Sequence, residues 1–288
     1  MMSQNAPLAE KKKWMAFPRI WLWSSAFISI LIAMTSLLGI FFEGTYSRET
    51  KAWAVQAVGQ DYANLLVVII LIASTYFLSR DSLRAYLVWL GAYIYIIYVF
   101  AIYAFAVHFN FLFLIYVLIL GASFFTLVGG LKAVDTVSIA AALRKNSRSR
   151  MVSALLMFIA VMFSDLWLSE IVPFLQSNEV PPVLIELGLP TNPVHVLDLA
   201  FILPGTIIVS ALLWKREALG LLLAVPLLVF MATMGAGIIA MFVLSASNGG
   251  PSVLPAGLTI GTIMILSTYF SYLFLKEIRD DIGFMGSS

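Results

Sequence analysis

The sequence predicts an all-α polytopic membrane protein, a bundle of eight transmembrane helices. Two compositional observations support this prediction. Hydrophobic residues make up 61% of the 288 residues and charged residues only 11%, whereas a soluble domain has about 25% charged residues. The apolar stretches are about 18–25 residues long and do not alternate, which suits membrane-spanning helices and excludes a transmembrane β-barrel. The polar intervals are too short for a soluble domain, so residues 1–288 are predicted to form one integral membrane domain.

Charged and turn-forming residues delimit the eight spans in order. The first follows Lys11–Lys13 and lacks a small-residue cleavage site, so it is predicted to be an uncleaved span rather than a signal peptide. Tight turns at 80–84 and 215–217 separate the second span from the third and the sixth from the seventh. His108 and Asn110 mark the turn before the fourth span. The predicted bounds are 19–41, 61–79, 85–107, 111–134, 151–174, 194–214, 218–245 and 256–275.

The basic residues predict the orientation. Alternating threading places 15 of the 17 Lys and Arg residues on one side, and only Arg48 and Lys51 on the other. By the positive-inside rule, both termini are expected to be cytoplasmic and the protein to lie in the plasma (inner) membrane of a bacterium. Membrane lipids are therefore the predicted partners, and the net charge of +2 does not indicate nucleic-acid binding. The 15 residues are Lys11, Lys12, Lys13, Arg19, Arg80, Arg84, Lys132, Arg144, Lys145, Arg148, Arg150, Lys215, Arg216, Lys276 and Arg279.

Three connections are long enough to have structure of their own. The basic segment 135–150 suits either an ordinary cytoplasmic loop, which we favour, or a short interfacial helix. On the other side, segments 42–60 and 176–192 hold most of the polar residues. Both are interpreted either as lids over a site or as plain connectors.

The two halves of the chain share a weak pattern. Asp61 and Asp198 both lie near the start of a predicted span, 137 residues apart, and both spans end in a basic turn, at Arg80 and Arg216. This pattern is compatible with two tandem four-helix halves, 1–145 and 146–288, related by an axis along the membrane normal. The opposing interpretation is chance, because topology by itself requires basic turns at those ends.

The strongest functional signal is acidic residues inside apolar spans. Asp198 lies three residues after His195, so the two side chains share a helix face, and Asn192 and Pro193 suit the helix start. At about 1.5 Å per residue, Asp165 and Asp198 reach similar depths in the outer half of the bilayer. Charges at such depths are costly and usually face a bundle interior, where they serve a function.

Further polar residues are predicted at the same level, which indicates an acidic pocket open to the outside. For Asp61 we favour a purely structural role, in which the carboxylate complements a helix N-terminus. Pro204 is expected to kink the sixth span and free a backbone carbonyl beside the pocket. The candidate ligand-binding residues are Gln60, Asp61, Asn64, Asp165, Glu170, Asn192, His195 and Asp198.

Two classes of function use this pocket. We favour a small-ligand or cation-binding protein, which is a transporter or an accessory or sensor protein. The alternative is an intramembrane enzyme with a lipid-like substrate, using Asp165, His195 and Asp198 in acid–base chemistry or as metal ligands. A metal site would resemble in outline that of ceramidase-like hydrolases, but their multiple histidines are absent, and the absence of cysteine excludes thiolate chemistry. A purely structural subunit is the third possibility. The sequence identifies no cofactor, substrate or oligomeric state.

Aromatic and small residues form two further patterns. Tyr86, Trp89, Tyr93, Phe100 and Tyr103 form one stripe of the third span. The stripe could bind a flat hydrophobic ligand, but we favour helix packing. A seam of small residues between 257 and 261 indicates close helix packing and only weakly indicates dimerisation.

The segment Asn192-Pro193-Val194-His195-Val196-Leu197-Asp198 resembles one found in a family of bacterial multi-pass membrane proteins without a known activity. Gly59-Gln60-Asp61 is similar to the entry of their second span. The resemblance covers two segments only. It implies that these residues matter to the family and does not indicate their role.

Overall fold

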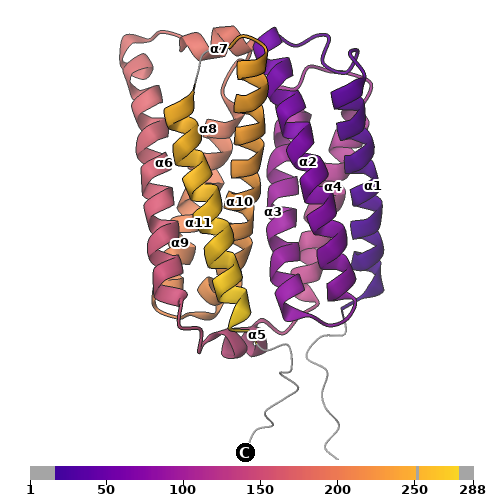
Figure 1. The fold of residues 1–288 in the computed structure, drawn as a ribbon, viewed down its shortest axis with the longest axis vertical. Helices are drawn as coiled ribbons and strands as arrows, with labels where there is room; N and C mark the ends of the chain where they lie inside the picture. Colours follow the sequence, from indigo (N-terminus) through magenta and orange to yellow (C-terminus); the bar gives the residue numbers. More distant parts are fainter. Residues whose placement is uncertain (1–16, 251–252, 279–288) are drawn as a thin grey trace, which may run out of the picture.

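The computed structural model describes residues 17–250 and 253–278, and these residues contain eight apolar helical segments long enough to span a membrane. The chain is therefore a multi-pass α-helical membrane protein, as predicted (Figure 1). The spans are α1 (Arg19–Phe41), α2 (Lys51–Leu78), α3 (Leu83–Ala106), α4 (Phe113–Lys132), α6 (Ser149–Ser177), the continuous run of α8 (Pro193–Leu197), η1 (Asp198–Ile202) and α9 (Leu203–Trp214), α10 (Ala218–Ser247) and α11 (Leu254–Lys276).

The predicted start of the second span is wrong by ten residues. Helix α2 begins at Lys51, because the Thr50 side chain accepts a hydrogen bond from the backbone N–H of Trp53 (3.2 Å) and caps the helix. The connection before it therefore covers only residues 42–50. Asp61 lies three turns inside α2, so its carboxylate cannot complement the helix N-terminus, and the structural role favoured for it is wrong.

Two short helices occupy the other long connections. Helix α5 (Thr136–Leu143) is capped by Asp135, and its buried Ile139 and Leu143 belong to the hydrophobic core, where α5 packs against α10. The segment favoured as an ordinary loop is thus partly helical. Helix α7 (Pro182–Leu187) lies at the other end of the molecule, which is the upper end in Figure 1, and α5 lies at the lower end.

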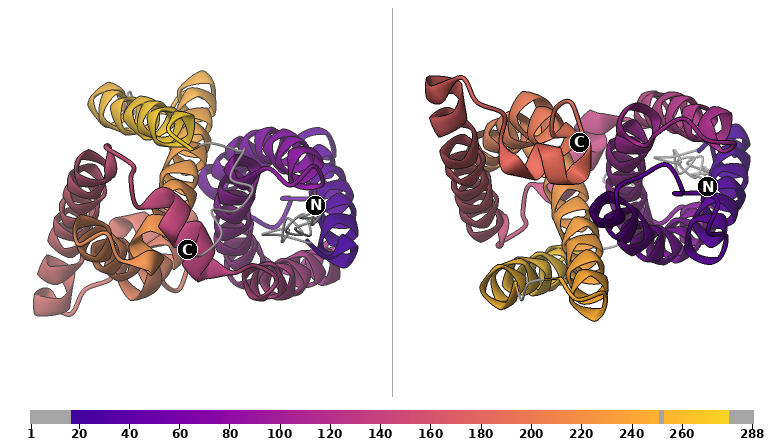
Figure 2. Two further views of the ribbon diagram at one scale, coloured as in Figure 1. Left: turned by 90° about the horizontal axis from the view of Figure 1, so that it is seen from below. Right: turned by 90° about the horizontal axis from the view of Figure 1, so that it is seen from above.

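The spans form two groups of four. Helices α1 to α4 form a closed ring, in which each helix packs against the next and α4 packs against α1 (Figure 2). In the second group α6 packs against α9, α9 against α10 and α10 against α11, whereas α11 barely touches α6. Helix α10 also packs against α2 and α3, and so joins the two groups. The duplication of 1–145 in 146–288 stays a prediction.

The aromatic stripe of α3 lies in the core of the first group. Tyr86, Trp89 and Tyr93 are fully buried, and Trp89 Nε1 donates to the Ser25 hydroxyl of α1 (3.0 Å). Helix α10 approaches the opposite face of α3 at Gly91, where a Cβ would lie 2.7 Å from the Pro226 carbonyl oxygen. The stripe therefore serves helix packing, as favoured from the sequence.

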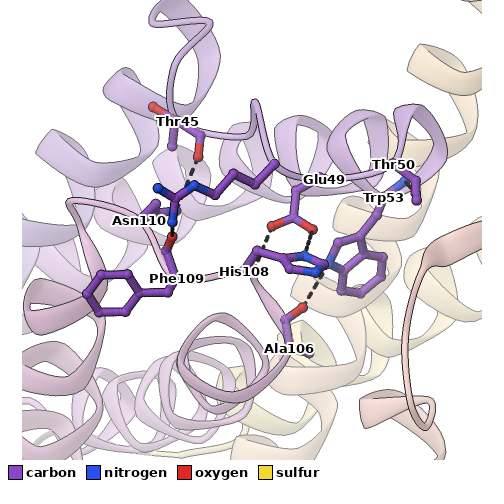
Figure 3. A network of polar contacts seen from close by, with 9 residues as sticks. Thr45, Glu49, Thr50, Trp53, Ala106, His108, Phe109 and Asn110 are labelled. Atoms are coloured by element: carbon purple, nitrogen blue, oxygen red, sulfur yellow. Dashed lines mark hydrogen bonds and ion pairs between the residues drawn. The ribbon is translucent and has the colours of Figure 1, made fainter.

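A network of polar contacts joins two connections at the upper end (Figure 3). Only 1% of the Glu49 side chain is exposed. Its Oε1 accepts a hydrogen bond from the backbone N–H of His108 (2.7 Å), and its Oε2 lies 2.7 Å from Nδ1 of the His108 ring. Three further bonds join the same region: Arg48 Nη1 to Phe109 O (2.6 Å), Trp53 Nε1 to Ala106 O (3.1 Å) and Asn110 Nδ2 to Thr45 O (3.1 Å). These contacts tie the α1–α2 connection and the start of α2 to the end of α3.

Candidate functional site

A cavity of about 800 Å³ lies between the two groups of helices. Its walls come from α2 and α3 on one side and from α6, η1, α10 and α11 on the other. Thr50 and Glu186 line it near the upper end, whereas Phe230 and Ile263 line it deeper. Most of the lining is apolar. The polar side chains on its wall include Gln60, Tyr98, Trp167, Asn192 and Asp198.

Asp198 lies at a local change of helix type. The segment η1 is a π-helix, in which the backbone N–H of Leu203 bonds to the Asp198 carbonyl five residues earlier. Pro204 follows at once and has no N–H to donate, so the regular α-helical pattern cannot continue through it. The irregularity expected from Pro204 thus takes the form of one π-helical turn, a feature often found at functional sites.

The Asp198 carboxylate accepts hydrogen bonds from two neutral donors on neighbouring helices. The Tyr98 hydroxyl of α3 donates to Oδ1 (2.9 Å), and Trp167 Nε1 of α6 donates to Oδ2 (2.8 Å). No Lys, Arg or His side chain among the described residues forms an ion pair with it. An ionised carboxylate without a paired cation is costly in a medium of low dielectric constant, and a positive charge beside it removes that cost. Asp198 is therefore a good acceptor for a cation that enters the cavity.

Aromatic rings surround this carboxylate. Tyr98 packs edge-to-face on Phe230, with ring centroids 5.4 Å apart, and Phe163 packs on Trp167 at 5.8 Å. All four residues line the cavity. Aromatic faces attract cations, and the effect is larger where water is excluded. The arrangement can therefore accommodate a positive charge together with an apolar group.

His195 lies beside the same tryptophan. Its ring packs on Trp167, with centroids 4.7 Å apart, and its Nε2 lies 3.4 Å from a carboxylate oxygen of Glu170. His195 and Asp198 therefore contact one residue, as their spacing predicted. The Asn192 side chain accepts from the backbone N–H of Val194 (2.9 Å), which confirms the predicted cap of this span.

Asp165 is not part of this arrangement. It is exposed on α6, and because it lies two residues before Trp167, its side chain projects about 200° away around the helix. The enzyme alternative requires that Asp165 lie close to His195 and Asp198. The structure does not bring these three residues together. Within residues 17–250 and 253–278, no group of three His, Asp or Glu side chains is placed to hold a metal ion.

Asp61 and Asn64 lie inside the ring of α1–α4 rather than on the cavity. Asp61 is 1% exposed and accepts from the hydroxyls of Tyr46 (2.6 Å) and Tyr103 (2.9 Å). Gln60, the preceding residue, does line the cavity. The predicted residues are therefore divided between the cavity and a buried acidic site behind its wall.

The sequence analysis missed two of the groups that hold these carboxylates. Trp167 lies in the outer half of an apolar span. A buried indole N–H requires an acceptor, so the sequence could have indicated a hydrogen bond from Trp167 to a carboxylate at the same depth. Tyr46 belongs to a connection, and no sequence signal assigns it to Asp61. Comparison with family models, curated proteins and solved structures gives no match. The resemblance to a bacterial membrane family stays a prediction.

Proposed function

We propose that this protein binds an organic cation with an apolar body in the cavity, as a transporter or as an accessory or sensor protein. The observation that supports this proposal is the Asp198 carboxylate, which lines a cavity of about 800 Å³ and whose hydrogen-bond donors among the described residues are Tyr98 and Trp167. A bound ammonium group supplies a positive charge beside Asp198, because Lys51, the described basic residue on the cavity wall, forms no ion pair with this carboxylate. The charged group would lie against Trp167, and the apolar body against Phe230 and Met234.

The distribution of basic residues supports an orientation for this cavity. Arg80, Arg84, Lys215 and Arg216 belong to connections at the lower end, whereas the described upper end has only Arg48 and Lys51. By the positive-inside rule, we propose that the lower end faces the cytoplasm and that the membrane is the plasma membrane. The cavity lies toward the upper end, so the ligand reaches it from the outer side.

Binding of a simple organic cation tests the proposal. The full chain in lipid nanodiscs is dialysed against radiolabelled octyltrimethylammonium, whose charge does not depend on pH, with empty nanodiscs to correct for partitioning. We expect saturable binding that octanol, of the same chain length but uncharged, does not displace. Asp198→Asn removes the charge with little change of shape and is expected to weaken binding at least about tenfold, or about 1.4 kcal/mol.

Asp165→Asn is the matched control, because it removes a carboxylate from the exposed face of the neighbouring helix and is expected to leave binding unchanged. The proposal is refuted if the wild-type chain binds no more probe than empty nanodiscs. It is equally refuted if Asp198→Asn and Asp165→Asn bind the probe as tightly as the wild type.

A further inference from the structure

Asp61 is surrounded by neutral groups on every side. The helices that pack against α2 bring to it Gly39 of α1, Tyr103 of α3 and, behind that ring, Tyr116 of α4. Helix α10 has no ionisable residue, and the only charged residues of α1, α3 and α4 lie at their lower ends. The remaining ionisable groups are tyrosine hydroxyls, Lys51 at the upper end of α2, Glu186 of α7, and the connection residues Glu43, Arg48, Glu49 and His108. None of these groups forms an ion pair with Asp61 among the described residues. No described cation thus compensates the charge of this carboxylate.

A directed chain of hydrogen bonds connects the cavity wall to Asp61. The Gln60 amide donates to the Tyr95 hydroxyl, which donates to Asn64 Oδ1 (3.0 Å), and Asn64 Nδ2 lies 3.5 Å from the Tyr103 hydroxyl. Tyr103 then donates to Asp61 Oδ1. Every donor points toward the carboxylate, which is the pattern expected for an ionised, acceptor-only group. Gln60 and Tyr103 also line the cavity, so the first and the last donor of the chain lie on its wall and the chain ends behind it, at Asp61.

The neighbourhood of Asp61 also accommodates the protonated form. The Tyr103 hydroxyl lies 3.3 Å from the Ala57 carbonyl oxygen as well as 2.9 Å from Asp61. If Asp61 takes up a proton, its new O–H can donate to the Tyr103 oxygen while the Tyr103 hydroxyl turns to Ala57. Both protonation states are therefore fully hydrogen-bonded with one hydroxyl rotation, so neither leaves a buried donor without an acceptor.

Tyr46 provides a route for the proton from the upper end. It belongs to the α1–α2 connection, and its hydroxyl donates to Asp61 Oδ2 (2.6 Å). Burial, together with the nearby Tyr103 and Asp61, raises the pKa of Tyr46 well above its usual value, so the hydroxyl stays protonated. A proton that reaches Tyr46 from the upper end would be relayed to Oδ2: the hydroxyl gives its own proton to the carboxylate, takes up the incoming one, and accepts a hydrogen bond from the new carboxylic O–H.

We propose that Asp61 is a proton-binding site coupled to the cavity, so that a bound cation favours its ionised form and an empty cavity favours uptake of a proton. The inference rests on the proposed function. A negative charge behind the cavity wall attracts a cation, and the attraction is strong where the dielectric constant is low. Because coupling between two sites is reciprocal, binding of the cation releases the proton, and protonation of Asp61 weakens binding of the cation.

The pH dependence of probe binding tests the coupling. The dissociation constant of octyltrimethylammonium is measured in nanodiscs from about pH 5 to about pH 8, and a pH-indicator dye in weak buffer reports proton release on binding. For the wild type we expect affinity to fall several-fold at low pH and protons to be released when the probe binds. Asp61→Asn is expected to bind weakly at high pH already and to release fewer protons, because the carboxylate that takes up and releases the proton is absent. Asp165→Asn should behave as the wild type.

Infrared difference spectra of the ligand-free chain separate this inference from the proposed function. Acidification should produce the carbonyl stretch of a protonated carboxylic acid that is lost in Asp61→Asn and kept in Asp165→Asn. If the probe never binds, the proposed function fails and this band alone decides whether Asp61 binds a proton. If the band is unchanged in Asp61→Asn, the proton site is refuted. If the band depends on Asp61 but the affinity does not change with pH, the coupling is refuted.

Tyr103→Phe provides a second variant if Asp61→Asn does not fold. It keeps the aromatic ring and the carboxylate and removes one donor to the ionised form. The carboxylic acid band should then persist to higher pH than in the wild type. A band that titrates as in the wild type would show that Tyr103 does not hold the ionised carboxylate, and would overturn the proposed connection to the cavity.

Discussion

The substitution Gly39→Ala tests the position of the Asp61 carboxylate without changing any group that titrates. Gly39 lies on α1, directly opposite Asp61. An ideal Cβ at this position would lie 1.9 Å from Asp61 Oδ2 and 2.8 Å from the Tyr46 hydroxyl oxygen. A methyl group cannot occupy that space, so either the carboxylate leaves the Tyr46 hydroxyl or α1 moves away from α2.

Both responses destabilise the fold. Adding a methylene-sized group to a packed core costs about 1–3 kcal/mol, and a buried hydroxyl that loses its acceptor costs about 1–3 kcal/mol. The higher helix propensity of alanine offsets up to about 1 kcal/mol of this loss. Either response, less this offset, leads us to expect that Gly39→Ala lowers the free energy of unfolding by about 1–2 kcal/mol. Gly121→Ala on α4 is the control, because its Cβ meets no atom within 4 Å.

Equilibrium unfolding in mixed micelles of SDS and a mild detergent, followed by tryptophan fluorescence, measures the difference between the two variants. Gly121→Ala should be as stable as the wild type or slightly more stable. If Gly39→Ala has the same stability as Gly121→Ala, the carboxylate of Asp61 does not lie against α1, and the argument for a closed, neutral environment around it fails.

Two further predictions concern contacts outside the spans. Glu49→Ala should lower the free energy of unfolding by about 1 kcal/mol, because it removes the acceptor of the exposed backbone N–H of His108, and limited proteolysis should then cut the upper connections faster. Burial raises the pKa of Glu277, but hydrogen bonds from Ser147 and the nearby Arg148 lower it more, so its folded-state pKa is below the usual value. Its contribution is therefore present at neutral pH and lost as pH falls. Glu277→Gln should cost about 0.5 kcal/mol at neutral pH, and melting curves should show no difference from the wild type in acid.

The spans were predictable because hydrocarbon imposes a strict requirement. In hydrocarbon, every backbone N–H and C=O group must form a hydrogen bond within its own helix. The length and apolarity of a stretch therefore identify it as a membrane-spanning helix. The start of α2 was not predictable from hydropathy, because its first turns hold Lys51, Gln56 and Gln60 and resemble a loop. A capping threonine decided that boundary, and hydropathy does not report caps.

The candidate site was only partly predictable, for a different reason. Periodicity within one helix placed His195 and Asp198 on one face, and both contact Trp167. The direction in which the Asp165 side chain points depends on which face of α6 packs against α9. The depth of a residue along the helix does not determine that face. Contacts across the sequence, such as Tyr98 to Asp198, require the arrangement of the two helix groups and have no local signature.

The different burial of the two carboxylates is an argument for their different roles. A group that binds a ligand must be reachable, and Asp198 lies on the cavity wall with aromatic rings beside it. A group that stores a proton must be shielded from the ligand, and Asp61 is fully buried one layer behind that wall. Tyr103 separates the two environments and contacts both. If both acids were merely structural, each would be expected to bond to the backbone of a neighbouring helix. Instead, both accept hydrogen bonds from side chains of α3, a helix of the ring that also lines the cavity.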